Sequence, residues 1–371
     1  MRVVIGTGGT AGHIFPAVAT GIHLRDRYGA EVVFVGTGTG QEASIVPAAG
    51  FQLKAIEALP FHRKVSLRTI AAPFAALRAS GVARGFVREA DVVLGMGGYV
   101  SVPVSLAARR EKVPLVVHEQ NAVLGLANRL AARWARVVAL SFREGGRHLP
   151  HGVRGVVVGN PVREPIIDAV GRRQEMAARA REQLQLEEGR TTLLVFGGSQ
   201  GAVRLNRATI ELSRILRERD DLQVVLVSGP RNHDEVTQSL QVDGNLLVRV
   251  VPFLDRMELG YSVADLAVTR SGATTVAELA VSGVPSILVP YPYATANHQE
   301  ANARALERAG GAVVLLDEQT DGRALAMTVG ELMRWSDRLP TMAGAAKTFG
   351  RPDAADALSG LVVSVADGAR Q

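Results

Sequence analysis

The sequence predicts an α/β fold made of two parallel-sheet halves, and three observations lead to it. The chain has 371 residues, which is longer than a single hydrophobic core usually supports. Short apolar runs alternate with longer helical segments along the chain, as expected for parallel strands covered by helices on both faces. Two glycine-rich turns, Gly6–His13 and Gly197–Ala202, each follow an apolar run and are typical of a strand, a tight turn and a helix start.

The predicted strands form two series. Each strand is a continuous apolar run rather than an alternating one, which is typical of strands buried on both faces. The first series occupies Val3–Ile5, Val32–Val35, Val92–Leu94, Leu115–Val117, Val137–Leu140 and Val156–Val158. The second series occupies Leu193–Phe196, Val224–Val227, Leu246–Val251, Leu266–Val268, Ile287–Val289 and Ala312–Leu316.

The boundary between the halves is expected at Gly159–Arg163, where an Asn-Pro pair marks a turn. A charged, alanine-rich helix is predicted over about 170–186, and a terminal helix from Pro352 to about Val365. The expected parts are a first domain over 1–162, a second domain over 163–344 and a terminal segment, 345–371, that packs back on the first domain.

The composition is that of a globular protein, with 47% hydrophobic and 21% charged residues. The absence of cysteine excludes disulfides and thiolate metal sites and is consistent with a reducing compartment. The chain begins on a strand-like run without the basic stretch and apolar core of a signal peptide, and no apolar run approaches the roughly 20 residues that span a bilayer. We therefore expect a soluble, cytoplasmic protein.

The net charge of +6 is unevenly distributed. Residues 1–163 carry 20 Lys and Arg against 9 Asp and Glu, which gives +11, whereas residues 164–371 carry 22 against 27, which gives −5. The first half therefore calls for an anionic partner or surface. We expect no nucleic acid among its partners.

The most basic element of the first half is Phe61–Arg88, which contains no acidic residue. Its apolar residues fall at helical spacing, and Pro73 is expected to break the run. Such an element can dock on an anionic membrane surface, or it can be a packed helix with solvated arginines. Its cations are Arg63, Lys64, Arg68, Arg78, Arg84 and Arg88.

Polar residues that follow the predicted strands are the candidate site of the first half, because α/β sheets bind ligands at the carboxyl ends of their strands. His13 ends the first glycine turn, where an imidazole could remove a proton from a hydroxyl at neutral pH. It could equally be a helix-start histidine bonded to a carbonyl. The run His118-Glu119-Gln120-Asn121 offers four hydrogen-bonding side chains, which suit sugar hydroxyls or plain solvent.

In the second half, the turn Gly197–Ala202 could hold a phosphate through Ser199 and backbone donors, or it could be a tight turn without a ligand. The strict G-x-G-x-x-G fingerprint is absent and no P-loop lysine follows, which disfavours dinucleotide and ATP sites. A second polar cluster, His298 and Gln299 with Asn302, follows a later strand.

The segment Arg270–Glu278 follows another predicted strand of the second half. Ser271 is the expected N-cap, and the small residues after it would let a ligand approach the first N–H groups of the helix. Glu278 lies one turn after Thr274, where a carboxylate could accept hydrogen bonds from a ribose diol. An ordinary capped helix with a solvated glutamate is the alternative.

No metal ion and no cofactor are expected. The sequence contains no Asp-x-Asp, and His, Asp and Glu do not occur at metal-ligand spacing. If a diphosphate leaves from this site, helix dipoles and backbone donors would have to stabilise its charge.

Taken together, these segments resemble the family 28 glycosyltransferases that add N-acetylglucosamine (GlcNAc) to lipid I in bacterial peptidoglycan synthesis. The motifs lie in the family's order and cover nearly the whole chain. They are Gly8–Ala17, Gly95–Ser101, His118–Asn121, Gly159–Arg163, Gly197–Ala202, Arg270–Ala273 and His298–Ala303.

The resemblance implies the GT-B fold, two Rossmann-like domains that face a central cleft, with UDP-GlcNAc bound mainly by the second. It implies that Glu278 binds the ribose, that Ser199 and the helix near Gly272 hold the diphosphate, and that further residues contact the uracil and the sugar. The implied donor-binding residues are Thr10, Gly12, Asn121, Arg163, Ser199, Phe253, Leu254, Ala273, Thr274, Thr275, Glu278, His298 and Gln299.

On the acceptor side, the resemblance implies that the first domain receives the diphosphate and sugar of lipid I. His13 would be the base for the C4 hydroxyl of N-acetylmuramic acid (MurNAc), with Glu119 as a second catalytic residue, and the anomeric carbon would invert as UDP leaves. The implied acceptor-binding residues are Gly8, Gly9, Thr10, His13, Tyr99, His118 and Glu119.

A lipid-linked acceptor also favours docking of Phe61–Arg88 on the anionic cytoplasmic face of the plasma membrane, with cell-wall and division machinery as further partners. The rival enzymes are a UDP-sugar epimerase and a small-acceptor glycosyltransferase of the same architecture. The rival that is not an enzyme is a nucleotide-sugar-binding regulator.

Overall fold

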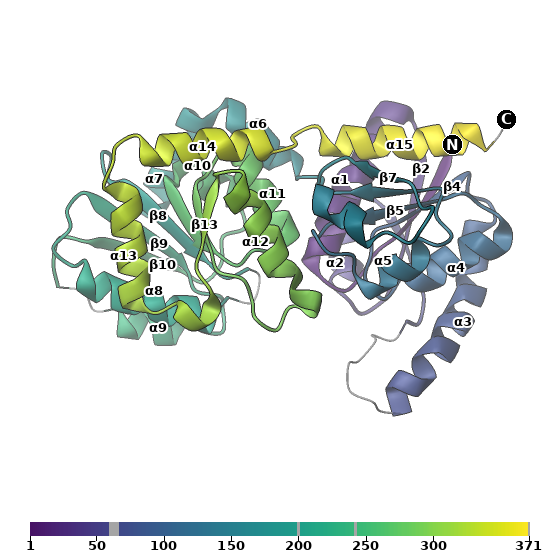
Figure 1. Cartoon of the computed structure of the whole chain (residues 1–371), viewed down its shortest axis with the longest axis horizontal. Coiled ribbons are helices and arrows are strands. Elements are labelled where there is room, and N and C mark those ends of the chain that lie inside the picture. The colour runs from purple at the N-terminus through teal and green to yellow at the C-terminus, as the bar shows by residue number, and fades with distance from the viewer. Residues whose placement is uncertain (59–66, 199–200, 241–242, 370–371) are drawn as a thin grey trace. The chain divides into compact units, whose positions relative to one another are not determined.

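Residues 1–58, 67–198, 201–240 and 243–369 are described by the structure, a computed structural model of the chain (Figure 1), with side chains from residue 75 onward in the second range. The chain divides into two compact units. The first contains Met1–Arg163 and Arg351–Gln371, and the second contains Glu164–Gly350. Residues 345–350, which we expected to pack on the first domain, thus belong to the second unit.

The first unit contains a seven-stranded, all-parallel sheet in the order β3-β2-β1-β4-β5-β6-β7. The order reverses between β1 and β4, which in open α/β sheets is where ligands bind. The strands are β1 (Arg2–Gly6), β2 (Glu31–Gly36), β3 (Gln52–Ala55), β4 (Val92–Gly95), β5 (Leu115–Glu119), β6 (Val137–Leu140) and β7 (Gly155–Val157).

Helices cover both faces of this sheet because successive side chains of a strand point to opposite faces. Val3 and Ile5 of β1 belong to one buried cluster with residues of α1 and α15, whereas Val4 belongs to another with residues of α3 and α4. The helices are α1 (Ala11–Tyr28), α2 (Glu42–Ala48), α3 (Leu67–Val87), α4 (Ser101–Glu111), α5 (Leu126–Ala131), the 3₁₀ turn η1 (Arg143–His148) and α15 (Ala354–Gly368).

The second unit repeats the same plan with six parallel strands in the order β10-β9-β8-β11-β12-β13. Its core joins Leu193 and Val195 of β8 to apolar residues of α8 and α13. The strands are β8 (Thr191–Phe196), β9 (Leu222–Val227), β10 (Leu247–Val251), β11 (Leu266–Thr269), β12 (Ser286–Leu288) and β13 (Ala312–Val314).

The helices of the second unit lie on both sides of its sheet (Figure 1). They are α6 (Glu164–Gly171), α7 (Arg173–Leu184), α8 (Val203–Ile215), α9 (His233–Ser239), α10 (Met257–Val263), α11 (Ala273–Ser282), α12 (His298–Arg308), α13 (Gly322–Met333) and α14 (Arg338–Phe349), with the 3₁₀ turns η2 (Thr295–Asn297) and η3 (Asp317–Gln319).

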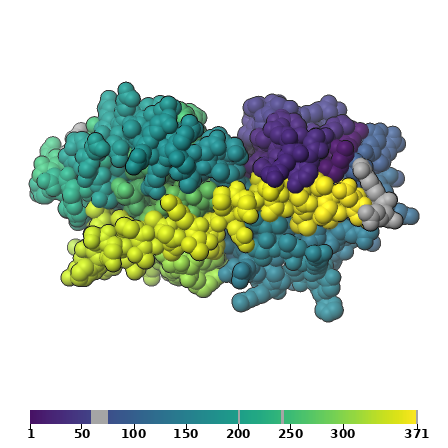
Figure 2. Space-filling view, turned by 90° about the horizontal axis from the view of Figure 1, so that it is seen from above, coloured from purple at the N-terminus to yellow at the C-terminus, as the bar shows by residue number. Residues whose placement is uncertain are grey.

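The terminal helix α15 returns to the first unit and packs against α1 (Figure 2). Leu358, Val362 and Ala366 are buried in the same cluster as Val3 and Ile5. The last helix is therefore part of the first unit's core.

All twelve predicted strands are present, and three details of the sequence analysis are wrong. Strand β3 was missed, because it lies at the sheet edge and its residues are not a continuous apolar run. The helix predicted over about 170–186 is present as α7, but the separate helix α6, which ends at Gly171 just before it, was missed. Helix α3 passes through Pro73 instead of breaking there, since a proline removes one backbone hydrogen bond and the remaining ladder continues.

Candidate active site

The candidate site of the first unit lies at the carboxyl ends of β1, β4 and β5, three adjacent strands. The loop after β1 leads into α1, and the loop after β4 runs alongside it. A Cβ on Gly98, whose φ is +75°, would lie 2.3 Å from the carbonyl oxygen of Gly8. Only glycine therefore allows these two loops to touch.

His13 stands in the first turn of α1, half-buried, with its imidazole against the loop after β4. A Cβ on Gly97 would lie 3.2 Å from both Cε1 and Nδ1 of the imidazole, and a Cβ on Gly98 would lie 3.6 Å from its Cδ2. The backbone of this loop therefore packs along the ring. Its Nδ1 lies 3.0 Å from Oε1 of Gln120, in the loop after β5. The site thus joins three loops through this one imidazole.

His118 is fully buried and is linked to His13 through the amide of Gln120. Burial lowers the pKa of His118 to about 4, although its hydrogen bond to the carbonyl of Gly159 acts in the opposite direction. The imidazole is therefore neutral at physiological pH, and it lies 3.1 Å from Nε2 of Gln120. Since its side chain is 0% exposed, it packs inside the fold next to the site and is not accessible to a ligand.

Glu119 is also buried, and both of its carboxylate oxygens hold the loop that follows β5. Oε1 accepts hydrogen bonds from the backbone and side-chain nitrogens of Asn121, at 2.9 and 3.1 Å. Oε2 accepts from the backbone of Gly125 and from Nδ2 of Asn128, both at 2.9 Å. Four such bonds fix the position of the carboxylate. This geometry favours a loop-positioning role for Glu119 over the proton-transfer role that we expected.

The first glycine turn is contacted by side chains of the loop that begins α2. The side-chain oxygen of Gln41 accepts a hydrogen bond from the backbone N–H of Ala11 at 2.9 Å. The buried carboxylate of Glu42 accepts a longer one, at 3.4 Å, from the backbone N–H of Gly9. Two backbone donors of the turn thus face the chain's own oxygens. Sequence reasoning missed both residues, because their only signal is a Gln-Glu pair about thirty residues downstream.

The remaining predicted residues of the first unit lie in the first glycine turn or contact residues of this turn and of α1. Thr10 precedes α1 as its N-cap, and Gly12 lies in its first turn. Tyr99 packs its ring 3.6 Å from the Cβ position of Gly9. Arg163 places its guanidinium 4.7 Å from the ring centroid of Phe15, a cation–π contact within the first unit.

In the second unit, the glycine turn after β8 closes as predicted, although Ser199, with Gln200, lies outside the described residues. The N–H of Gly201 donates to the carbonyl of Gly198 at 3.0 Å. Gly201 has φ +74°, and its Cβ position would be 2.4 Å from the carbonyl oxygen of Ser228. This close approach requires glycine and brings the turn against the end of β9.

Helix α11 begins one residue later than we expected. Its N-cap is Gly272, and no side chain caps it. Ser271, the expected cap, is wrong in that role: it is fully buried and its hydroxyl donates to the carbonyl of Gln299 at 2.8 Å. The helix therefore begins with Ala273, Thr274 and Thr275 and without a side-chain cap, which suits an anion at its positive end.

Glu278 projects from α11 one turn further on and is 4% exposed. The hydroxyl of Tyr261, on α10, donates to its Oε2 at 2.9 Å, and the tyrosine ring packs edge-on to Phe196 at 6.0 Å. Tyr261 was missed by the sequence analysis. Its only sequence signal is a tyrosine among small residues 17 positions earlier.

The loops after β12 and β10 carry the other predicted residues. Oε1 of Gln299 accepts from the backbone N–H of Tyr291 at 2.9 Å, so its amide orients the loop after β12. Nδ1 of His298 lies 2.7 Å from the carbonyl of Thr295. Phe253, 49% exposed, and the half-buried Leu254 lie in the loop after β10. These positions all lie at the carboxyl edge of the second sheet.

The best-defined cavity lies away from the carboxyl edges of the two sheets, and the described residues form no metal-binding cluster. A cavity of about 380 Å³ lies at the opposite, amino edge of the second sheet, lined among others by Thr191, Asp265, Pro285 and Trp335. None of the predicted donor residues lines it. Over the described residues, no group of three His, Cys, Asp or Glu side chains could hold a metal ion, and no described helix is long and apolar enough to cross a membrane.

Comparison with known proteins agrees with this architecture along the whole chain. The glycosyltransferase family 28 N-terminal domain matches residues 3–140, and the C-terminal domain of the same family matches residues 192–358. A UDP-N-acetylglucosamine–N-acetylmuramyl-(pentapeptide) pyrophosphoryl-undecaprenol N-acetylglucosamine transferase of Halothermothrix orenii is 41% identical over 99% of this chain and 100% of its own length.

Solved structures give the same result. The structure of Acinetobacter baumannii MurG, 30% identical, superposes with a TM-score of 0.78 over 98% of this chain and 99% of that one. A UDP-GlcNAc 2-epimerase from Neisseria meningitidis shares the fold at 15% identity, with a TM-score of 0.66 over 98% and 99% of the two chains. The fold is GT-B, and this chain belongs to glycosyltransferase family 28.

Proposed function

We propose that this protein transfers GlcNAc from UDP-GlcNAc to the C4 hydroxyl of MurNAc in lipid I, giving lipid II and UDP. The observation that carries the proposal is the full-length similarity, at 41% identity, to a relative named for this transfer. The polar strand ends of each unit supply the groups that the reaction needs. The epimerase shares only the fold, at 15% identity, and so gives the rival activity less support.

The reaction is a single displacement with inversion. Nε2 of His13 accepts the proton of the C4 hydroxyl while that oxygen forms the new bond to the anomeric carbon of GlcNAc. The bond between the anomeric carbon and the UDP oxygen breaks with its electron pair, and UDP leaves as the anion. His13 then returns its proton to solvent. One C–O bond forms, one breaks and one proton is transferred, so the reaction needs no further co-reactant.

The second unit binds most of the donor. Glu278 accepts the ribose hydroxyls, and the uncapped start of α11 at Ala273, Thr274 and Thr275 stabilises the diphosphate and the charge that develops on it. Ser199 adds a diphosphate contact. Phe253 and Leu254, with Arg163, flank the uracil, whereas the GlcNAc is bound by His298, Gln299 and Asn121, with Thr10 and Gly12 close to the transferred sugar.

The first unit binds the acceptor. Gly8, Gly9 and Thr10, with Tyr99, contact the diphosphate and sugar of lipid I. Because Gln41 and Glu42 already face the N–H groups of this turn, Gln41 has to move if the acceptor's phosphate binds there. His118 and Glu119 support the site from within the fold, as their burial and hydrogen bonds favour.

Because the acceptor carries a lipid, the protein has to dock on a membrane, and α3 offers a surface suited to this docking. In its described part, Ala79, Ala83 and Val87 are buried against the first unit, while Leu77 and Val82 are 44% and 51% exposed. Arg78 on this helix and Arg88 just after its last residue are also exposed, whereas Arg84 is paired with Glu111. Arg63 and Lys64 lie outside the described residues, as does the side chain of Arg68.

We therefore place the protein at the cytoplasmic face of the plasma membrane, docked through Phe61–Arg88, where cell-wall and division proteins would be its partners. The first half's charge of +11 supports attraction to anionic lipid.

The decisive experiment measures consumption of UDP-GlcNAc with and without a soluble lipid I analogue. The proposal expects UDP release that depends on the analogue and a disaccharide product with a β-1,4 bond. Conversion of UDP-GlcNAc to its 2-epimer without an acceptor would establish the epimerase instead. UDP binding without turnover under either condition would indicate a regulator.

A further inference from the structure

We propose that Gln120 is a positioning residue that holds His13 in the tautomer with the proton on Nδ1, so that Nε2 is left as the proton acceptor. The inference rests on the proposed function for its catalytic consequence. Its structural part rests on a chain of hydrogen bonds that runs from the backbone of Gly159 through His118 and Gln120 to His13.

The backbone carbonyl of Met96 determines which way the Gln120 amide faces. A carbonyl oxygen only accepts, and it lies 2.8 Å from Nε2 of Gln120. If the amide were turned by 180°, two acceptor oxygens would face each other in a buried position, since Gln120 is 1% exposed. The amide nitrogen therefore points toward Met96, and the amide oxygen points toward His13.

That orientation fixes the proton of His13. The Oε1 of Gln120 also only accepts, so a hydrogen bond over the 3.0 Å to Nδ1 requires the proton on Nδ1. In the neutral imidazole, Nε2 then carries the lone pair. Gly97 and Gly98 pack against Cε1, Nδ1 and Cδ2, which opposes rotation of the ring away from this bond.

The other end of the chain is fixed in the same way. The Nε2 of Gln120 donates a second hydrogen bond to Nδ1 of His118, at 3.1 Å, so that nitrogen is unprotonated. The proton of His118 lies on its Nε2 and is donated to the carbonyl of Gly159 at 3.0 Å. Because burial keeps His118 neutral, its Nδ1 remains an acceptor for Gln120. Every donor in the chain thus meets an acceptor.

A carboxylate commonly orients a catalytic histidine, and its charge also stabilises the imidazolium that forms. Gln120 orients His13 without adding a charge. The neighbouring carboxylate of Glu119 does not substitute, because its two oxygens already accept four hydrogen bonds, three from the loop after β5 and one from Asn128 of α5. The site therefore fixes the direction of proton transfer by neutral groups alone.

The direct test is ¹⁵N NMR of the full-length protein labelled at histidine, which distinguishes protonated from unprotonated ring nitrogens. Signals are assigned by loss in His13→Gln and His118→Gln. We expect protonated Nδ1 in His13 and protonated Nε2 in His118. In Gln120→Met, which has similar volume but no donor or acceptor, His13 should populate the Nε2-protonated form. A wild-type His13 with the proton on Nε2 would overturn the proposal.

The kinetic test uses the same variant with UDP-GlcNAc and a soluble lipid I analogue. Gln120→Met should lower kcat by roughly tenfold to a hundredfold while the KM for UDP-GlcNAc changes less than about twofold. Gln120→Glu is not a suitable rescue variant, because it would place a second acceptor oxygen against the buried carbonyl of Met96 and against Nδ1 of His118. An unchanged kcat in Gln120→Met would refute the positioning role.

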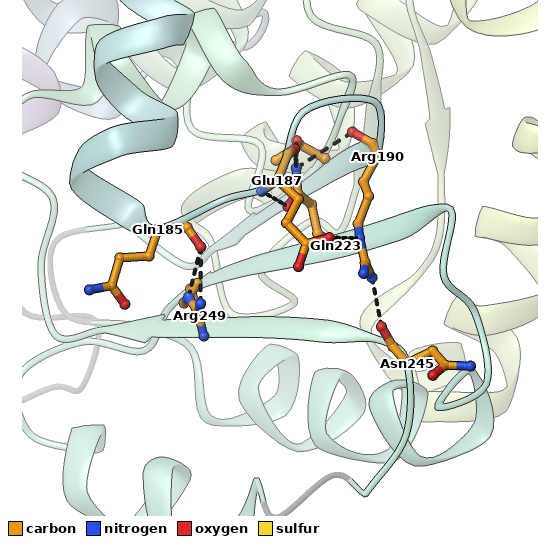
Figure 3. A network of polar contacts seen from close by, with 7 residues as sticks. Gln185, Glu187, Arg190, Gln223, Asn245 and Arg249 are labelled. Atoms are coloured by element: carbon orange, nitrogen blue, oxygen red, sulfur yellow. Dashed lines mark hydrogen bonds and ion pairs between the residues drawn. The ribbon is translucent and has the colours of Figure 1, made fainter.

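The matched control is Gln223→Met, because Gln223 is a fully buried glutamine at the centre of a hydrogen-bond network in the second unit (Figure 3). Its side-chain oxygen accepts from the backbone N–H of Glu187, and its side-chain nitrogen donates to the backbone carbonyl of Glu187 and to the hydroxyl of Thr192. Its loss should lower stability without changing the His13 tautomer. If no variant and no wild-type preparation turns over lipid I, the proposed function fails, while the NMR result still decides the tautomer.

Discussion

Two buried polar groups, the hydroxyl of Tyr261 and the amide of Gln120, hydrogen-bond the two side chains on which the proposed reaction depends most. Neither touches a ligand in the proposed reaction. Tyr261 donates to Glu278 in the second unit, and Gln120 accepts from His13 in the first. At the residue scale, the site therefore depends on groups whose effect is on orientation, and orientation can be measured separately from binding.

The Tyr261–Glu278 pair gives a first prediction. Tyr261→Phe removes the hydroxyl that donates to Oε2, so the carboxylate should hold the ribose less well, and the Kd for UDP should rise about tenfold. Glu278→Ala should weaken UDP further. Isothermal titration calorimetry measures both, with the exposed Tyr28→Phe as control. Unchanged UDP affinity in Glu278→Ala would refute the ribose assignment.

His118 gives a second prediction, on pH. Its pKa is about 4 in the folded protein and 6.5 without the fold's influence, so the unfolded chain binds more protons between these values. The stability that depends on its neutrality is fully present above about pH 6.5 and is lost as pH falls toward 4. The expected loss between pH 7 and pH 5 is about 2 kcal/mol.

Urea unfolding at pH 7 and pH 5 checks this expectation. In a Trp335→Phe background, the remaining tryptophan, Trp134, reports on the first unit. His118→Gln should show the smaller loss on acidification, whereas the exposed His151→Gln should behave like the parent. The same loss in all three proteins would assign the acid sensitivity to other groups.

At the scale of elements, the sequence predicted twelve strands because buried parallel strands are continuous apolar runs. It missed β3, whose run Gln52–Ala55 is half polar, and it misplaced the cap of α11. Ser271 is a good N-cap residue in isolation, but its hydroxyl bonds Gln299, which is 28 residues away. Contacts between distant segments have no local sequence signal, so Tyr261 and the role of Gln120 were missed for the same reason.

The exposed face of α3 gives a third prediction. Replacing Leu77 and Val82 together by glutamate should reduce co-sedimentation with anionic vesicles several-fold, because it removes apolar area and adds like charge to the lipid surface. Wild-type binding should also weaken with salt. The matched control replaces Ile215 and Met327, exposed apolar residues of the second unit, by glutamate. Equal loss in both double variants, or binding that salt does not affect, would contradict docking through α3.

At the scale of the whole molecule, the two glycine turns have different surroundings. The turn after β8 closes on backbone from β9, whereas the turn after β1 faces the side chains of Gln41 and Glu42. Two similar turns would suggest one shared ligand, but the different surroundings support two diphosphates, one for each substrate. The uneven charge of the halves is consistent with that division of labour.

Hydrogen–deuterium exchange gives the fourth prediction. Saturating UDP should slow exchange in peptides that cover the turn after β8 and the start of α11, and it should leave the peptide of residues 6–13 unchanged. A soluble lipid I analogue should slow exchange in that peptide. Inosine, which has a ribose but no diphosphate, is the control. Protection of residues 6–13 by UDP alone would reverse the assignment of the two turns.

The return of α15 to the first unit has a consequence for the order in which the protein is made. Residues 164–350 are continuous in the chain and form the second unit, but the core of the first unit includes Leu358, Val362 and Ala366. During synthesis, which proceeds from the N-terminus, the second unit has all its residues before the first has its last helix. The half that leaves the ribosome first is thus the half that finishes folding last.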